Sequence, residues 1–555
     1  MIHYVCKYTP LELFAGFSAE CAILDNLQDN FEVSDRVAHA NLCGFGKAVI
    51  QAALSGQAGE LVLVNCCDTM RRAYDVIKKS GACHFLYLLD LPHQDSCCQQ
   101  EILAGNLLAL KSAYAEYSGQ PFDPEAFRAA FSPPRDSEGP YIGIFGARAG
   151  QEIEEMIREL LALPLRNLTC VGNRSLAPDK KVLANTCPEA EVFLIYAGAL
   201  LAQLPCLRMS DTAGRRSLYN DPNLRGAIYH TIKFCDFYGF EYAELKNKLA
   251  VPLLKLETDY TRQSKGQLQT RIEAFAETLS GLQAKQGNVG KGRKMSRSGQ
   301  EYVAGIDSGS TSTDVVILAQ DKTIAAALVI PTGGSAQTSA EKSLAEALHS
   351  AGIARSSVSR VVTTGYGRAY IDGSDESITE ITCHAKGAHY LNPATRTIID
   401  IGGQDSKVIR IDDSGAVMNF VMNDKCAAGT GRFLEMMART LGLTLGEMSK
   451  LGLNWREDIV ISSMCTVFAE SEVVSLIAQN KAVPDIIHGL NNSVAAKVSS
   501  LITRLGPEGG FILTGGVAQN LGVVRALEVK LGIKLYICGE AQLCGALGAA
   551  LFALE

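Results

Sequence analysis

YVAGIDSGSTSTDVVILA at 302–319 decides the fold of the C-terminal half of this 555-residue chain. It reads as an apolar strand, a turn rich in Gly, Ser and Thr, and a second strand, which is the pattern of a hairpin. RTIIDIGGQDSKVIRIDDSG at 396–415 repeats that plan, with Asp307 and Asp400 at corresponding places about 93 residues apart. The duplication predicts two related lobes that face each other across a cleft.

Each hairpin has an aspartate at the end of its first strand, followed by small residues. Glycine lets the backbone approach a polyphosphate, backbone N–H groups and hydroxyls bind its oxygens, and carboxylates hold Mg²⁺ directly or through water. A third glycine turn, LTGGVAQN at 513–520, follows the apolar run GFIL and is placed to lie beneath adenine and ribose. The predicted nucleotide-binding residues are Ser308, Gly309, Ser310, Thr311, Gly402, Gly403, Gly515 and Gly516.

One glycine turn alone is a common hairpin, but three in this order are far more specific. The set resembles the actin, sugar-kinase and heat-shock-chaperone superfamily of ATPases, in which a ribonuclease-H-like lobe is repeated. The resemblance implies that ATP and Mg²⁺ bind here. It also implies that Asp307 and Asp405 lie near the metal or the attacking water, and that Gln404 helps to position that water.

Two cysteines narrow this resemblance. NDKCAAGTGRFLE at 423–435 and SSMCTVFAESEVVSLIAQN at 462–480 place Cys426 and Cys465 where helices are expected to begin. These segments resemble the activator component of 2-hydroxyacyl-CoA dehydratases and benzoyl-CoA reductases, which implies a [4Fe–4S] cluster. Four thiolates are needed and each chain offers two, so we expect a homodimer with the cluster between its subunits. The alternative is that both cysteines are buried structural residues.

The N-terminal half alternates strand-like runs with helical segments, which predicts an α/β protein with parallel sheets. Several cysteines follow these runs, at the strand ends where α/β proteins place their chemistry. Cys66 and Cys67 follow LVLVN, and Cys235 follows IYHTIKF. Because side chains alternate along an extended segment, we expect Cys66 and Cys67 to point to different sites, with only one of them a ligand.

ANLCGFGKA at 40–48, NCCDTMRRAYD at 65–75 and FCDFYGFE at 234–241 resemble the cluster-bearing subunits of the 2-hydroxyacyl-CoA dehydratase family. The resemblance implies that Cys43, Cys67 and Cys235 ligate a [4Fe–4S] cluster. Further cysteines resemble those of double-cubane cluster proteins, which implies an [8Fe–9S] group. In the alternative, Cys6 and Cys206 are core residues and only one cluster forms. Spacing does not divide the six cysteines between two cubanes. The additional cysteines are Cys6, Cys170 and Cys206.

Composition limits the partners and the location. A net charge of −7 leaves no excess of basic residues for nucleic acid. No apolar run is long enough to span a membrane, and the N-terminus lacks a secretory pattern, so we expect a cytoplasmic protein whose 17 cysteines form no disulfide framework. The expected domains are 1–280, with lobes at about 1–138 and 139–280, a linker at 281–300, and the ATPase at 301–555.

The sequence therefore predicts ATP-dependent electron transfer. Reduced ferredoxin or flavodoxin would supply electrons to the bridging cluster, and the N-terminal half would accept them to reduce a small substrate, with a second cluster-bearing polypeptide as a further partner. One alternative is a 2-hydroxyacyl-CoA dehydratase with a built-in activator, and another is a non-catalytic activator of a separate protein. A third is a sugar or acetate kinase that binds no iron.

Overall fold

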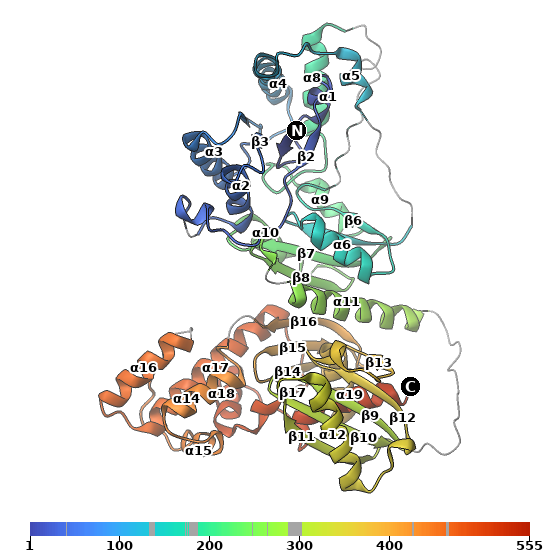
Figure 1. Cartoon of the computed structure of the whole chain (residues 1–555), viewed down its shortest axis with the longest axis vertical. Helices are drawn as coiled ribbons and strands as arrows, with labels where there is room; N and C mark the ends of the chain where they lie inside the picture. The colour runs from blue at the N-terminus through green and yellow to red at the C-terminus, as the bar shows by residue number, and fades with distance from the viewer. Residues whose placement is uncertain are drawn as a thin grey trace. The chain divides into compact units, whose positions relative to one another are not determined.

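The computed structural model divides the chain into two compact units, Met1–Ile272 and Glu273–Glu555 (Figure 1). Helix α11 (Lys265–Gln286) runs into the first part of the predicted linker, and residues 287–301 lie outside the described part of the chain. The described residues are 1–39, 41–131, 139–172, 174, 176, 187–246, 248–262, 265–286, 302–424, 427–461 and 466–555.

The first unit contains two parallel four-stranded sheets, as the alternation of apolar runs and helices predicts. Their strand orders, β2-β1-β3-β4 and β6-β5-β7-β8, are the same pattern used twice. Helices cover the sheets, because parallel strands are apolar on both faces. The strands are β1 (Ile2–Tyr4), β2 (Cys21–Ile23), β3 (Glu60–Val64), β4 (Phe85–Leu89), β5 (Tyr141–Gly146), β6 (Leu165–Asn167), β7 (Leu224–Ile232) and β8 (Leu253–Thr258).

The helices of this unit start directly after strands or short loops. Helix α3 illustrates the local rules: it begins just after the loop that follows β3, and Gly81 ends it in the left-handed conformation at φ 65°. The helices are α1 (Leu11–Ala15), α2 (Gly44–Leu54), α3 (Asp68–Ser80), α4 (Cys97–Ser118), α5 (Pro124–Ala129), α6 (Gln151–Leu160), α8 (Glu189–Leu201), α9 (Ala213–Leu218), α10 (Asp236–Leu245) and the first part of α11.

The second unit contains two sheets of matching design, which confirms the predicted duplication. In each, the hairpin that carries the glycine turn is extended by a third antiparallel strand, and a later strand pairs in parallel with the first. The first sheet has β9 (Tyr302–Ser308), β10 (Ser312–Ala319), β11 (Ile324–Pro331), β12 (Val358–Thr364) and β13 (Glu376–Ser377), and the second has β14 (Thr397–Ile401), β15 (Ser406–Ile411), β16 (Val417–Asn423) and β17 (Phe511–Thr514).

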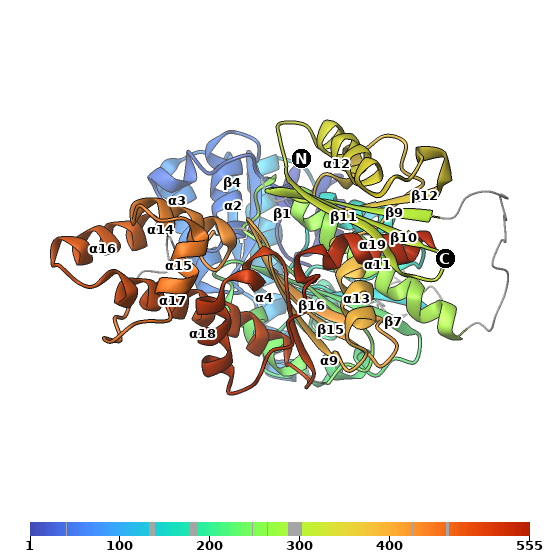
Figure 2. The same ribbon diagram turned by 90° about the horizontal axis from the view of Figure 1, so that it is seen from below.

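Alternate residues of the first sheet enter two separate cores. Ala304 and Ile306 pack with helix α12 (Ala336–Ala351), whereas Val303 and Val316 pack with α19 (Cys544–Ala553). The two helices thus cover opposite faces of this sheet (Figure 2). This alternation is what a period of two along a strand produces, and it fixes the register of the hairpin.

The second sheet packs against a larger helical group, drawn in orange and red in Figure 1. The long helix α17 (Val483–Leu505) supplies much of this core, including Ile486, Leu490 and Val494. Among the described residues, no helix is long and apolar enough to cross a membrane. The other helices of the unit are α13 (Glu380–Leu391), α14 (Gly431–Thr440), α15 (Leu445–Leu451), α16 (Thr466–Ala478) and α18 (Leu521–Leu531).

Candidate functional site

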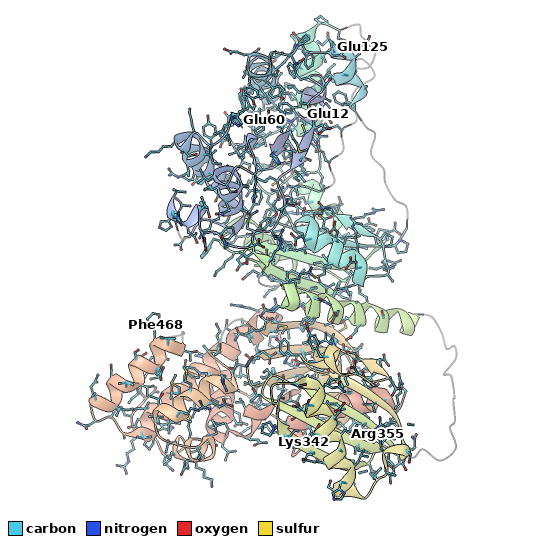
Figure 3. The ribbon with its side chains drawn as sticks, in the orientation of Figure 1. Glu12, Glu60, Glu125, Lys342, Arg355 and Phe468 are labelled. Atoms are coloured by element: carbon cyan, nitrogen blue, oxygen red, sulfur yellow. The ribbon has the colours of Figure 1, made fainter. Side chains whose placement is uncertain are left out.

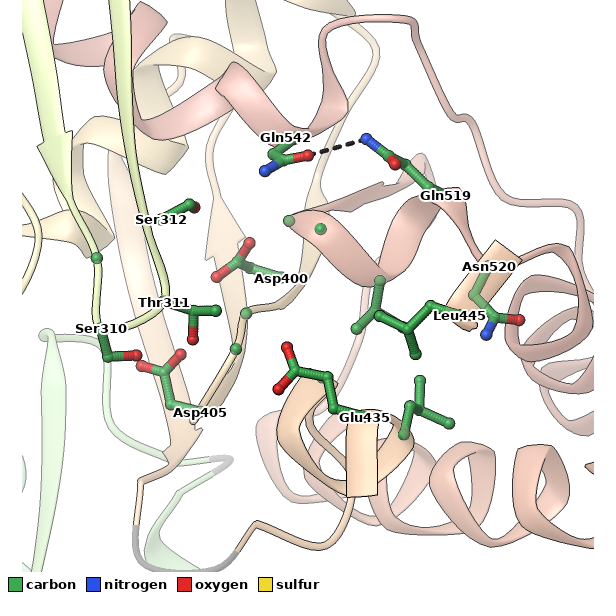
Figure 4. Close-up of a pocket in the computed structure, with 18 of the residues that line it drawn as sticks. Ser310, Thr311, Ser312, Asp400, Asp405, Glu435, Leu445, Gln519, Asn520 and Gln542 are labelled. Carbon is green, nitrogen blue, oxygen red and sulfur yellow. Dashed lines mark hydrogen bonds between the residues drawn. The ribbon is translucent and has the colours of Figure 1, made fainter. Parts of the chain in front are cut away.

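A cavity of about 500 Å³ opens where the three glycine turns of the second unit meet. In Figure 4, Ser310 and Thr311 of the first hairpin face Asp405 of the second. Gln404 is exposed and Ser308 is buried, and neither lines the cavity. The predicted residues that do line it are Asp307, Gly309, Ser310, Thr311, Gly402, Gly403, Asp405, Gly515 and Gly516.

The two hairpin turns approach each other closely because the second turn has a glycine, Gly403, at the point of contact. A Cβ atom on Gly403 would lie 2.0 Å from Thr311 Oγ1, so any side chain there would force the turns apart. Helix α14 starts against the same turn, since the amide of Gly431 donates to the Gly402 carbonyl at 2.9 Å. The backbone is thus arranged for close approach to a polyphosphate from two sides.

A buried lysine joins three carboxylates at the floor of the cavity. Lys407 Nζ lies 2.7 Å from Glu380 Oε2, 2.8 Å from Asp405 Oδ2 and 3.2 Å from Asp400 Oδ2. Burial would lower the pKa of Lys407, but the three carboxylates outweigh it and hold that pKa well above its usual value. Burial raises the pKa of Asp405 to about 6, even with the ammonium beside it.

Histidine 384 lies between the first-strand aspartates of the two lobes. Its Nδ1 is 3.6 Å from Asp400 Oδ1 and its Nε2 is 3.9 Å from Asp307 Oδ2. Burial, with Glu380 and Asp314 nearby, raises the pKa of Asp307 well above its usual value, and burial raises the pKa of Asp314 to about 7. The cavity therefore holds more carboxylates than cations, a charge balance that suits the Mg²⁺ ion of a bound nucleotide.

The two cysteines predicted to hold the bridging cluster, Cys426 and Cys465, lie outside the described residues. Helix α16 begins at Thr466, directly after Cys465, and α14 begins at Gly431. Phe468 projects from α16 and is 66 % exposed (Figure 3). The helix that follows Cys465 therefore presents an apolar side chain to its surroundings.

A second cavity lies in the first unit and is lined by seven cysteines. In the part of the chain that the structure describes, no three His, Cys, Asp or Glu side chains converge closely enough to hold a single metal ion. The seven thiols line one space instead, and thiolates are the ligands that an iron–sulfur group takes. The cysteines are the predicted Cys6, Cys43, Cys67, Cys170, Cys206 and Cys235, together with Cys66.

Sheet topology explains why these residues meet. In each sheet the first and third strands are neighbours, so the connections that follow them leave toward opposite sides and open a crevice at the carboxyl ends. Cys6 follows β1 and Cys66 follows β3 in the first sheet, while Arg148 follows β5 and Cys235 follows β7 in the second. All four line the one cavity.

Three of the cysteines also cap helices. Cys43, Cys67 and Cys235 are the N-cap residues of α2, α3 and α10, and the amide of Gly46 donates to Cys43 Sγ at 3.4 Å. A helix N-terminus carries a partial positive charge, which favours a thiolate or an anionic group beside it. These are the three cysteines that the resemblance assigns to one cluster; the other four lie in loops.

The expectation that Cys66 and Cys67 point to different sites is wrong, because both line the same cavity. Strand β3 ends at Val64, and the amide of Cys66 donates to the Val64 carbonyl at 2.7 Å. The chain turns there, so the alternation of an extended strand no longer applies. Interaction with the Cys66 thiol is the largest cause of the raised pKa of Cys67.

Polar neighbours favour a thiolate at Cys206. Its Sγ lies 3.1 Å from the Tyr238 hydroxyl. Burial raises the pKa of Cys206, but the charge of Arg208 and the bond from Tyr238 outweigh it, so that the pKa is lowered overall. Burial raises the pKa of Cys235 to about 12. The cavity therefore holds thiols with different tendencies to ionise.

Comparison with known proteins finds a match for each half of the chain. The C-terminal residues 304–553 match the model of the BadF/BadG/BcrA/BcrD ATPase family. The activator of lactoyl-CoA dehydratase from Anaerotignum propionicum is 48% identical over 254 residues, which are 46% of this chain and 98% of that protein. The (R)-2-hydroxyglutaryl-CoA dehydratase activating ATPase of Acidaminococcus fermentans is 44% identical over 46% of this chain and 97% of its own.

The chain belongs to the BadF/BadG/BcrA/BcrD ATPase family. Its N-terminal residues 6–132 and 131–279 match the model described as 2-hydroxyglutaryl-CoA dehydratase, D-component. This ATPase is therefore fused to a dehydratase-type unit of the same system. Among solved structures, the activator of 2-hydroxyisocaproyl-CoA dehydratase from Clostridium difficile with bound ADPNP is 44% identical, covers 46% of this chain and 94% of its own, and has a TM-score of 0.45.

Sequence reasoning missed several residues of this ATPase and its fused unit. Lys407 carried a readable signal, since it lies two residues after Asp405, a spacing that puts two side chains on the same side of an extended segment. His93 follows β4 at a strand end and lines the cysteine cavity. Glu380 and His384 had no such signal, because they lie on α13 and reach the cleft only through packing.

Other cysteines of this chain lie outside the cysteine cavity. Cys97 and Cys98 are exposed at the start of α4 and do not line the cysteine cavity. Cys383 and Cys544 are buried in the ATPase unit, as expected for residues with a packing role. The cysteines of the first unit thus separate into a set around one cavity and a set outside it.

Proposed function

We propose that this chain couples ATP hydrolysis to the transfer of low-potential electrons into its N-terminal unit. Reduced ferredoxin or flavodoxin is the proposed donor. Cys426 and Cys465, with the same pair from a second copy of the chain, would hold a [4Fe–4S] cluster that receives the electron. The acceptor would be an iron–sulfur group, a [4Fe–4S] or an [8Fe–9S] double cubane, held by the cysteine cavity and used to reduce a small substrate.

One observation supports this proposal most strongly. The ATPase half is joined, in one chain, to a unit in which seven cysteines line one cavity. Two related proteins named as dehydratase activators are over 40% identical to the ATPase half. A sugar kinase would have no use for such a cavity. The large number of free thiols suits the reducing cytoplasm, which is the proposed location.

The residues of the ATPase cleft have distinct proposed tasks. Gly309, Gly402 and Gly403 would bring backbone amides to the phosphates, and Asp307 and Asp405 would hold Mg²⁺ or orient the attacking water. Lys407 keeps Asp400 ionised, since burial alone would raise the pKa of that carboxyl but His384 and Lys407 lower it. The exposed Gln404 lies in the second turn and would reach the water only after the lobes close.

In the N-terminal unit, the cysteines would bind the iron–sulfur group and the helix N-termini would stabilise its negative charge. Such a group supplies one-electron reduction at low potential. The cavity walls are otherwise mainly apolar, with Phe45, Met70 and Leu91 among them, and so would limit the access of water. A second cluster-bearing subunit is a further proposed partner.

The test is anaerobic purification with iron and acid-labile sulfide counting on the full chain. Cys426→Ser should lose the iron of the bridging site, and Cys67→Ser should lose iron from the N-terminal unit. Cys97→Ser is the matched control, because Cys97 is exposed and lies outside the cavity. A wild-type protein without iron would contradict the proposal, and unchanged iron in Cys67→Ser would remove the acceptor role from the cavity.

A second candidate is a 2-hydroxyacyl-CoA dehydratase with its activator attached. The match of residues 6–279 to the dehydratase D-component model favours it, and His93 offers a titratable side chain at the cysteine cavity. Anaerobic incubation with ATP, a reductant and a 2-hydroxyacyl-CoA would then yield an enoyl-CoA, measured by chromatography. Loss of that product in His93→Gln, with iron retained, would support this candidate.

A further inference from the structure

Four buried or half-buried arginines of the first unit differ in their partners. Arg148 Nε lies 3.1 Å from Asp25 Oδ1, Arg174 Nη2 lies 2.6 Å from Glu12 Oε2, and Arg215 Nε lies 2.8 Å from Glu241 Oε1. Each of these guanidinium groups therefore has its own carboxylate, as buried charges require.

Arg208 has no such partner. Among the described residues it makes no ion pair with a carboxylate, and its Nε atom is buried without a hydrogen-bond partner. The nearest acceptor is a thiol, since Nη1 lies 3.9 Å from Cys206 Sγ, which is at the long end for a bond to sulfur. The guanidinium carbon lies 5.0 Å from the centre of the Phe237 ring, which supports one face of it.

Arg208 lines the cysteine cavity, and its position there is central. Its charge acts on Cys43, Cys66, Cys67, Cys170, Cys206 and Cys235, which are six of the seven cysteines that line the cavity. The backbone is fixed as well, because the Arg208 carbonyl lies 2.6 Å from His93 Nδ1.

The charge of this residue cannot be removed by losing a proton. Guanidinium stays protonated in proteins, whereas the pKa of a buried lysine shifts more readily. Lys7, a further buried cation near these thiols, donates to the Leu204 carbonyl, and burial lowers its pKa. Arg208 is thus a permanent positive charge in a cavity whose described lining residues include no carboxylate, so an anionic group bound there would compensate it.

We propose that Arg208 is a positioning residue that donates N–H groups to the sulfur atoms of the iron–sulfur group in this cavity and raises its reduction potential. The inference rests on the proposed function. An added electron makes that group more negative, and a nearby fixed positive charge stabilises the reduced form more than the oxidised form. Nη1 lies near the Cys206 thiol and Nε has no hydrogen-bond partner, so both donors are available to sulfur atoms of a bound group.

The test compares Arg208→Gln and Arg208→Lys in the full chain, purified anaerobically. The readouts are iron content and the midpoint potential from a redox titration followed by electron paramagnetic resonance. Arg208→Gln should retain iron and shift the potential of the N-terminal group to a more negative value by at least 59 mV, a tenfold change for a one-electron couple. Arg208→Lys keeps the charge and should restore most of the shift.

Arg225→Gln is the matched control, because it removes the same charge from an exposed position in the same unit. An unchanged midpoint potential in Arg208→Gln would overturn the inference. This holds even if the KM for a substrate rises, because Arg208 would then bind the substrate and not the iron–sulfur group. Loss of iron in Arg208→Gln but not in Arg208→Lys would support it. Loss in both, with thermal unfolding unchanged, would overturn it. Iron-free wild-type protein would instead count against the proposed function itself.

Discussion

Replacing Lys407 by methionine should destabilise the ATPase unit by about 3 kcal/mol at pH 7.5. Removing one partner of a buried ion pair costs about 3–5 kcal/mol, because the other charge is left without compensation. Here three carboxylates lie within 3.2 Å of the ammonium. We expect the lower end of the range, because the pKa of Asp405 is already about 6 and its carboxyl can take up a proton in the variant.

The chain offers a probe for this unit. Trp455 is its single tryptophan, lies in the second unit and stacks on His488 with 3.8 Å between ring centres. Its fluorescence should therefore report unfolding of the ATPase unit during urea titration. With a slope of about 2 kcal/mol per molar urea, a loss of 3 kcal/mol lowers the midpoint by about 1.5 M. Lys386→Met is the control, because exposed ion pairs contribute only about 0–1 kcal/mol.

The pH dependence separates this explanation from a simple packing defect. Without the ammonium, the carboxylates have raised pKa values in the folded state, and such groups stabilise the fold at low pH and lose that contribution as pH rises. The deficit of Lys407→Met should therefore shrink between pH 7.5 and 5.5. A deficit below about 1 kcal/mol, the range of an exposed pair, or one that is equal at both pH values, would refute the reasoning.

Two further predictions concern other parts of the chain. Gly403→Ala should weaken MgATP binding by about tenfold, or 1.4 kcal/mol, because its Cβ atom would meet Thr311 Oγ1. The control Gly334→Ala changes an exposed glycine with open space around it and should bind MgATP normally. Calorimetric titration measures both affinities, and equal affinities would show that the turns separate before binding. His230, buried and bonded to Thr258 Oγ1 at 3.0 Å, has its pKa lowered by burial to about 4. Stability of the cluster-free first unit should thus fall as pH drops from about 6.5 to 4, by up to about 3 kcal/mol, and calorimetry of His230→Gln should show a smaller fall.

Much of the ATPase site follows from local sequence. A hairpin with Asp, Gly and hydroxyl residues at its turn forms from neighbouring residues, so Asp307, Thr311 and Gly403 could be assigned before the fold was known. Their meeting across one cavity was also predictable, because the pattern occurs twice. Lys407 was missed even though its spacing of two from Asp405 puts both side chains on the same side of an extended segment.

The cysteine cavity shows where local reasoning ends. Strand ends correctly marked Cys67 and Cys235, since parallel strands gather their carboxyl ends at one edge. The alternation rule failed at Cys66 because the chain leaves the strand two residues earlier, at Val64. Side chains alternate between two sides only while the backbone is extended. Hydrophobicity alone does not mark the last residue of the extended strand.

The sequence by itself determined the duplicated hairpins, the three glycine turns and the placing of most cysteines at strand ends, because these depend on contacts between near neighbours in the chain. Only the tertiary structure decided that Glu380 and His384 reach the nucleotide cleft from helix α13. It alone showed that Arg208, unlike Arg148, Arg174 and Arg215, lies half-buried among thiols and pairs with no carboxylate of the described residues. The physical reason is that the pairing of a buried charge depends on which distant segments pack beside it, and spacing along the chain carries no record of that.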